Sequence, residues 1–158
     1  MTTFPLFHLP LVAMEHVLCM MPPFDLIDLS KTSSRAKRAV KRFLRLKPKF
    51  EISIGYTEEP HIILANINES WGSFRTTDES RIGYETETLL SLPFHKTIKH
   101  SMNPYEEWMK EYEYVKGFLD CRLAGVFYGA FTDLPRQFNE IGDWILTKFR
   151  QSRLDNPR

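Results

Sequence analysis

The pattern of hydrophobic and polar positions predicts a short helix with no polar stripe near the N-terminus. From Leu11 to Met21 only two of the side chains are polar, so nothing separates a buried side from an exposed one. Pro10 suits the first turn of this helix, and Pro22 and Pro23 end it, because proline lacks the N–H that a helix interior uses. The segment is too short to cross a bilayer, which takes about 20 apolar residues. Its apolar surface therefore indicates a protein partner.

Two further helices are predicted before the chain reaches residue 48. The stretch 24–30 (FDLIDLS) places its apolar side chains at mostly helical spacing. Hydroxyl groups at 32–34 can cap a third helix, which Pro48 ends. The apolar stripe of this third helix consists of Ala36, Ala39, Val40, Phe43 and Leu44. Most of its other positions are basic.

Beyond residue 49 the spacing of apolar residues becomes that of strands. Two alternating stretches, Phe50–Tyr56 and His61–Ile67, predict a hairpin, and a third strand is expected around Trp71. The next region is less regular, with a strand signal at Tyr84–Leu92 and an expected loop after it.

A helix, a strand and a second helix complete the pattern. Asn103 is expected to cap a helix that runs through Phe118. Leu123–Phe131 follows as a strand candidate, and Asp133 is expected to cap the last helix, whose apolar stripe ends at Phe149. The whole pattern predicts an α+β fold: an N-terminal three-helix module, a small antiparallel sheet or hairpin, and a C-terminal helix–strand–helix.

An ordered series of short motifs runs through the three N-terminal helices: Leu9-Pro10, Val17-Leu18, Met21-Pro22-Pro23, Asp25-Leu26, Leu29-Ser30 and Ser33-Ser34-Arg35. This series resembles an F-box. Two positions depart from that pattern, because Leu11-Val12 replaces the usual acidic residue and Ala36 the usual aromatic one. The resemblance implies that the module binds a Skp-type adaptor through Leu9, Pro10, Met14, Val17, Leu18, Leu26 and Leu29. Packing among the three helices is the alternative role of each residue.

The rest of the chain resembles the type 2 F-box-associated region that follows an F-box in a large, nematode-expanded family. The resemblance is carried by the hairpin, Ser70-Trp71, Asn103-Pro104, Glu107-Trp108, Tyr114-Val115 and Cys121. In that family, repeats resembling leucine-rich repeats follow and recruit substrate, whereas this chain has one strand–helix unit. The resemblance implies two domains, 1–48 and 49–158. It also implies a substrate-receptor subunit of an SCF (Skp–cullin–F-box) ubiquitin ligase, which holds an unidentified protein substrate and performs no chemistry itself.

The single strand–helix unit suggests where a substrate could bind. A lone unit has no neighbouring repeat to pack on, so its strand should pair with the hairpin sheet or remain at an edge. An open edge can accept a strand from another chain. We therefore expect a possible substrate-binding edge at Leu123, Val126, Phe127 and Tyr128.

Charge is distributed unevenly along the chain. Residues 1–49 carry nine basic side chains against three acidic ones, a net charge of +6, whereas the whole chain carries +1 and the remainder therefore −5. The basic segment 35–49 offers an alternative function, a nucleic-acid-binding or nuclear-targeted protein without a ubiquitin role. Its regular apolar stripe and its shortage of aromatic side chains instead favour a solvated helix face, so nucleic acid is not an expected partner.

The sequence contains no arrangement that predicts catalysis or a cofactor. The seven glycines are scattered and form no phosphate-binding loop. The adjacent pairs Glu58-Glu59 and Glu106-Glu107 point apart, and His95 and His100 stand five apart, the wrong spacing for two metal ligands on one helix face. We therefore expect no enzyme, no cofactor and no metal.

The two cysteines and the N-terminus bear on the compartment. Cys19 and Cys121 are expected to be buried small hydrophobic residues and not a disulfide. Pro5, His8 and Pro10 interrupt any secretory signal at the N-terminus. These features predict a protein of the cytoplasm or nucleus that is not attached to a membrane.

Overall fold

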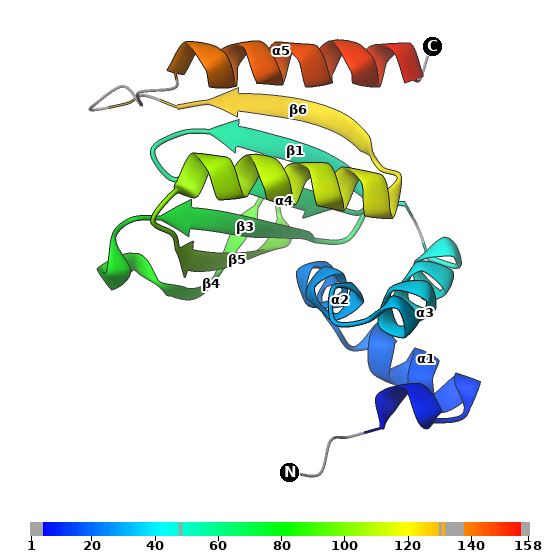
Figure 1. Cartoon of the computed structure of the whole chain (residues 1–158). Helices are drawn as coiled ribbons and strands as arrows, with labels where there is room; N and C mark the ends of the chain where they lie inside the picture. The colour runs from blue at the N-terminus through cyan, green and yellow to red at the C-terminus, as the bar shows by residue number, and fades with distance from the viewer. Residues whose placement is uncertain (1–4, 48, 130, 132–137, 156–158) are drawn as a thin grey trace.

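The computed structural model describes residues 5–47, 49–129, 131 and 138–155, and these form an α+β fold (Figure 1). Its α-helices are α1 (Leu11–Cys19), α2 (Pro23–Ser30), α3 (Ser34–Arg45), α4 (Pro104–Leu119) and α5 (Phe138–Asp155). Short 3-10 helices lie at Leu6–His8 and Glu79–Arg81. Its strands are β1 (Glu51–Tyr56), β2 (His61–Ala65), β3 (Ser70–Thr76), β4 (Gly83–Leu89), β5 (Leu92–His100) and β6 (Arg122–Tyr128).

The three predicted N-terminal helices are confirmed. Helix α1 begins directly after Pro10 and ends at Cys19, two residues earlier than expected. Helix α3 is capped by Ser33, whose hydroxyl accepts a hydrogen bond of 3.0 Å from the backbone N–H of Ala36. Pro48 and Asp133, expected as a helix end and a helix cap, lie outside the described residues.

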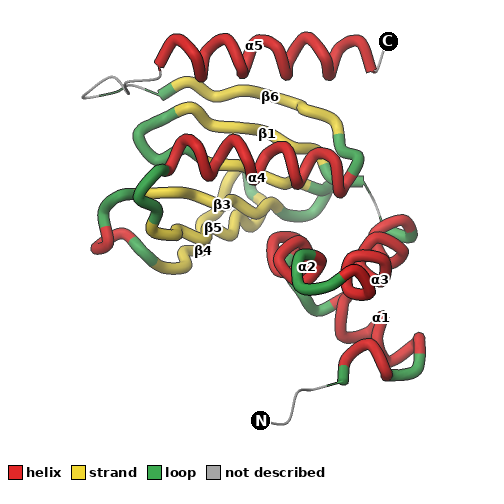
Figure 2. Tube along the Cα trace, viewed as in Figure 1, coloured by secondary structure: helices red, strands yellow, loops and turns green. Residues whose placement is uncertain are grey.

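The sheet is larger than the sequence predicts and it is mixed, not antiparallel. Its strand order is β4-β5-β3-β2-β1-β6. Figure 2 shows the strands in yellow. The predicted hairpin of β1 and β2 is confirmed, and β3 continues it antiparallel. The correction comes from two parallel pairs, because β5 lies along β3 and β6 lies along β1. Local alternation cannot show such pairings, since a parallel pair needs a long crossover connection.

The loop expected after Leu92 is in fact β5, a strand inside the sheet. Its buried side chains, Phe94 and Ile98, are separated by polar residues, which hide the apolar alternation from a short window. The strand is held by β3 on one side and by β4 on the other. Tertiary pairing therefore outweighs the weak local signal.

Helices α4 and α5 pack beside each other on one face of the sheet. Trp144 of α5 contacts the rings of Trp108 and Tyr112 of α4, at centroid distances of 5.5 and 5.3 Å. Ile141 and Ile145 on the predicted stripe of α5 are 1% exposed each. Two details differ from the sequence analysis: Asn103 precedes α4 without a side-chain cap, and α5 continues past Phe149 to Asp155.

One hydrophobic core runs from the N-terminal helices into the sheet. It includes Leu18, Ile27 and Val40 of the helices together with Ile52 of β1 and Trp108 of α4. The division into domains at residue 48 stays a prediction. Among the described residues, the structure holds no helix with the length and apolar character needed to span a bilayer.

Candidate functional site

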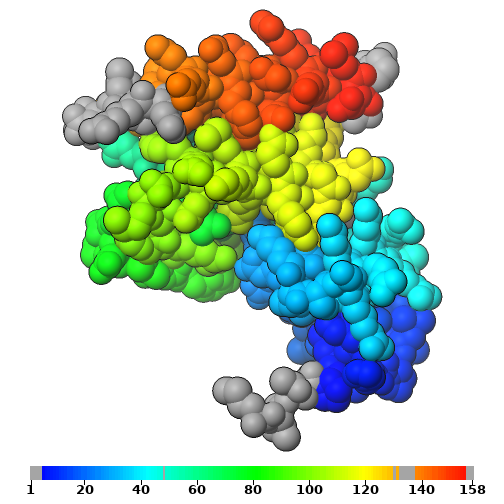
Figure 3. All heavy atoms as spheres, in the orientation of Figure 1, coloured from blue at the N-terminus to red at the C-terminus, as the bar shows by residue number. Residues whose placement is uncertain are grey.

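Helix α1 carries apolar side chains to solvent at the end of the molecule away from the sheet, where the space-filling view shows it in blue (Figure 3). Val12 is 79% exposed and Leu11 is 43% exposed, while Met20, just after the helix, is 78% exposed. Within α1, Leu18 is the residue that is fully buried. These large apolar side chains lie at both ends of one short helix, and they are available to a protein partner.

The seven residues predicted to contact an adaptor lie in three different environments. Pro10 is exposed, whereas Leu9, Met14, Val17 and Leu29 are half-buried. Leu18 and Leu26 are 0% and 3% exposed and belong to the core of the chain itself. In the free chain these two side chains therefore hold α1 and α2 in place. The contact of all seven residues with an adaptor stays a prediction.

The most exposed apolar residues of this end of the molecule are not among the seven predicted contacts. These are Leu11, Val12 and Met20, which we call the α1 apolar patch. A helix without a polar stripe does not reveal which side faces solvent. One signal was available, because Leu11 and Val12 stand where the F-box pattern has an acidic, solvent-compatible residue.

The basic residues of α3 point away from the core. The predicted apolar stripe is confirmed, since Ala36 and Val40 are fully buried and Phe43 nearly so. On the other side, Arg35 donates a hydrogen bond of 2.9 Å to the carbonyl oxygen of Phe7 and ties the N-terminal segment to α3. The remaining basic side chains of the helix are exposed.

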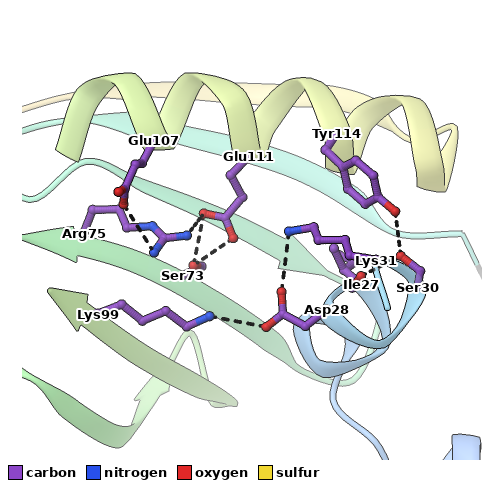
Figure 4. Close-up of polar contacts among 10 residues, drawn as sticks. All are labelled: Ile27, Asp28, Ser30, Lys31, Ser73, Arg75, Lys99, Glu107, Glu111 and Tyr114. Atoms are coloured by element: carbon purple, nitrogen blue, oxygen red, sulfur yellow. Dashed lines mark hydrogen bonds and ion pairs between the residues drawn. The ribbon is translucent and has the colours of Figure 1, made fainter. Parts of the chain in front are cut away.

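Helix α2 is fastened to the sheet and to α4 by polar contacts, drawn in Figure 4. The Ser30 hydroxyl donates to the carbonyl oxygen of Ile27 and lies 2.8 Å from the hydroxyl of Tyr114. Because a serine has one hydroxyl proton, Tyr114 is the donor of the second bond. Lys99 of β5 pairs with Asp28 at 3.4 Å. These contacts fix the direction in which α1 projects from the sheet.

A buried carboxylate fastens α4 to the sheet. Glu111 is 8% exposed, and it accepts hydrogen bonds from Ser73 at 3.2 Å and Arg75 at 3.1 Å (Figure 4). Arg75 also lies 3.8 Å from Glu107. Glu111 is not among the residues predicted from the sequence, although its position three residues after Trp108 places it on the buried stripe of the helix.

The strand expected to form a substrate edge does lie at an edge of the sheet. Strand β6 pairs with β1 and is the last strand in the sheet order. Its Leu123 is buried and its Val126 half-buried, whereas Phe127 and Tyr128 are 54% and 61% exposed. The two aromatic side chains are available to a partner. Binding of a substrate at this edge stays a prediction.

Two cysteines differ sharply in environment. Burial raises the pKa of the Cys121 thiol to about 11, so this thiol is protonated and a poor nucleophile at neutral pH. Cys19, expected to be buried, is exposed at the end of α1, because this end of the helix is not covered by the rest of the chain. Both are free thiols.

Hydrogen bonds on the sheet connect three titratable side chains in series. His95 lies 2.7 Å from the hydroxyl of Tyr84 and 2.8 Å from a carboxylate oxygen of Glu69. His95 and His100 both belong to β5, so neither lies on a helix. Within the described residues no group of three or more His, Cys, Asp or Glu side chains could hold a metal ion.

Comparison with known proteins assigns the N-terminal module. Residues 6–47 match the family model of the F-box domain, which covers the 3-10 helix at Leu6–His8 and helices α1 to α3. No curated protein and no solved structure matches the chain. The F-box domain supports an F-box protein, and it implies a Skp-type partner.

Proposed function

We propose that this chain is a substrate-receptor subunit of an SCF-type ubiquitin ligase, of the nematode-expanded type in which a type 2 F-box-associated region follows the F-box. One observation carries the proposal: the residues that match the F-box domain include a helix whose apolar patch projects away from the rest of the chain. An F-box binds a Skp-type adaptor, and this patch is the surface that such an adaptor would cover.

The proposed division of labour follows the architecture. The F-box end, with the α1 apolar patch and the seven predicted residues, binds the adaptor. The sheet with α4 and α5 holds a protein substrate, with the β6 edge as a candidate surface. Because one chain binds both the adaptor and the substrate, the concentration of substrate lysines near the conjugating enzyme is raised. The chain itself acts as a non-catalytic adaptor, in the cytoplasm or nucleus.

The contacts between α2 and the sheet matter for this function. A receptor can present a substrate in one direction only if its two ends do not turn freely against each other. The Ser30–Tyr114 bond, the Asp28–Lys99 pair and the continuous core all join the F-box to the sheet. They support a rigid spacer between adaptor and substrate.

Co-purification with a purified Skp-type adaptor tests the proposal. The unmodified chain should elute with the adaptor as one complex, whereas Leu9→Ala combined with Pro10→Ala should abolish co-elution. Each buried apolar side chain contributes about 1.5–3 kcal/mol, so loss of such an anchor weakens binding at least about tenfold.

A control variant separates loss of the interface from loss of the fold. Leu154→Ala changes a side chain that is 79% exposed on α5, far from the F-box, and should leave co-elution unchanged. Circular dichroism should show the same secondary structure for all three proteins. Co-elution of the doubly substituted chain at the level of the unmodified one would rule out the leucine-proline turn as the adaptor site.

A further inference from the structure

A pocket lies where the end of the F-box meets the end of α4. It has a volume of about 440 Å³ and is lined by the C-terminal half of α3, by Lys47, Lys49 and Phe50, and by the C-terminal end of α4. In Figure 1 the cyan end of α3 lies beside the yellow-green end of α4. We call it the basic pocket, after the Lys41, Arg45, Lys47 and Lys49 side chains on its lining.

The cations of the basic pocket are not neutralised by the chain. All four side chains are exposed, and none of them forms an ion pair with another described residue. Asp120 is the one acidic residue on the lining. Four cations against one carboxylate around a small concavity repel one another, and a bound anion would relieve that repulsion.

The lining of the pocket between these cations is apolar. Leu44 and Phe50 are half-buried and Phe118 is 7% exposed, so all three keep part of their surface available at the pocket. A pocket of this volume is in the range of small-ligand sites and admits a few side chains, not a folded domain. Its chemistry suits a ligand with an apolar side chain between negatively charged groups.

We infer that the basic pocket binds an acidic peptide segment of the protein substrate, in which Asp or Glu side chains flank an apolar residue. The inference rests on the proposed function, since it names the class of substrate. Charge complementarity carries it: the carboxylates pair with Lys41, Arg45, Lys47 and Lys49, and the apolar side chain contacts the half-buried Leu44 and Phe50.

The pocket favours a peptide over a nucleic acid for two reasons. A nucleic acid tracks an extended basic groove and stacks its bases on exposed aromatic faces. Here the cations converge on one concavity, Phe118 is 7% exposed, and Phe50 already packs edge-on against Trp71 at a centroid distance of 5.9 Å. The pocket is also separate from the α1 apolar patch, so adaptor and substrate can be bound together.

A peptide array incubated with the full chain in complex with the Skp-type adaptor tests the inference. The probes carry a central Leu flanked on both sides by Glu, by phosphoserine, by Ser or by Lys. Glu-flanked peptides should be retained and the Ser- and Lys-flanked ones should not. Phosphoserine should bind more tightly than Glu, because each phosphate brings nearly two negative charges. Retention should fall as salt is raised.

Charge reversal locates the binding site. Lys41→Glu combined with Arg45→Glu should weaken binding of the Glu-flanked peptide at least about tenfold, because two charge-assisted contacts become repulsive. Arg38→Glu combined with Arg42→Glu is the matched control, since it reverses two exposed charges on the same helix outside the pocket. The control should keep nearly full binding. Both variants should retain the adaptor.

Distinct outcomes overturn the inference. If both double variants lose peptide binding equally, the binding depends on overall charge and not on the pocket. If Glu-flanked and Ser-flanked peptides bind equally, the ligand is not an acidic peptide. If a 20-nucleotide single-stranded DNA binds more tightly than the Glu-flanked peptide, and only the pocket variant loses this binding, the pocket is a nucleic-acid site. If the unmodified chain forms a dimer and the pocket variant is a monomer, the pocket binds a second copy of this chain. If the chain binds the peptide but not the adaptor, the proposed function is refuted, whereas the pocket remains a peptide-binding site.

Discussion

Individual residues show how burial sets the chemistry of this chain. His61 packs its ring against Phe74 at a centroid distance of 4.3 Å, and its Nδ1 lies 3.0 Å from the carbonyl oxygen of Glu59. The ring also lies over Gly55, where a Cβ would come within 2.1 Å of it, so a larger residue there would force the His61 ring to shift. Burial, assisted by the nearby Lys96, lowers the pKa of His61. The folded chain therefore prefers the neutral imidazole.

This preference predicts a loss of stability in weak acid. Because the folded pKa lies below the unfolded one, the free energy of unfolding is highest above the ordinary value of 6.5 and falls as the pH drops through the folded pKa. Each unit of pKa difference corresponds to about 1.4 kcal/mol, and each kcal/mol to about 2–4 °C in Tm for a chain of this size.

Thermal unfolding at a series of pH values between about 7.5 and 5 measures the effect, since His titrates in this range. His61→Gln should flatten the dependence of Tm on pH. His8→Gln, at an exposed position, should leave the dependence unchanged and serves as the control. Equal slopes for the unmodified chain and His61→Gln would show that His61 does not govern stability in this range.

At the scale of single residues, the sequence predicts which positions are apolar but not which of them face solvent. Leu18 and Val12 belong to the same helix and both are apolar, yet one is fully buried and the other is 79% exposed. The difference comes from α2 and α3, which pack against one side of α1. Glu111 is the opposite case, a charged residue that is buried. Its carboxylate is satisfied by Ser73 and Arg75 of β3, a strand distant in the sequence.

At the scale of elements, the helices are predicted well and the sheet only in part. Proline and serine mark the ends of α1 to α3, so local chemistry defines these helices. The hairpin of β1 and β2 is also local. Strand β6 pairs with β1, and β5 with β3, across long stretches of chain, whereas β4 and β5 are consecutive. Polar residues such as Lys96 and Thr97 weaken the signal of β5. Its existence depends on its neighbours β3 and β4.

The edge position of β6 gives a prediction about hydrogen exchange. A strand paired on one side only leaves about half of its N–H groups without a strand partner. In the free chain, amides of β6 should therefore alternate between slow and fast exchange from Arg122 to Tyr128, whereas those of β1 should be slow throughout. Uniformly slow exchange at 126–128, equal to that of the hairpin, would mean that the edge is covered.

A substitution tests whether this edge has a separate role. Val126→Pro removes one N–H and should increase exchange along β6, while Val126→Ala, which keeps the N–H, should not. Both variants should still bind the adaptor, because β6 lies at an edge of the sheet and apart from α1, which carries the proposed adaptor surface. Loss of adaptor binding in Val126→Pro would show that the edge supports the F-box.

At the scale of the whole molecule, the F-box and the sheet share one core. The buried cluster that contains Leu18 and Ile27 also contains Ile52 and Trp108, and the Ser30–Tyr114 bond crosses the same boundary. The motif series predicts the F-box because its residues lie close together in the sequence. It does not predict this junction, since Ser30 and Tyr114 lie 84 residues apart in the sequence and meet only in the folded chain.

The central claim is that the α1 apolar patch of an F-box is covered by a Skp-type adaptor, and calorimetric titration with purified adaptor tests it most directly. Met20→Asp, at a position 78% exposed, should leave the fold unchanged and weaken binding at least about tenfold, because it removes an apolar contact and buries a charge. Ile67→Asp, at a position 83% exposed on the β2–β3 turn, should bind like the unmodified chain. Equal affinity of the Met20→Asp variant and the unmodified chain, or no binding by the unmodified chain, would contradict the claim.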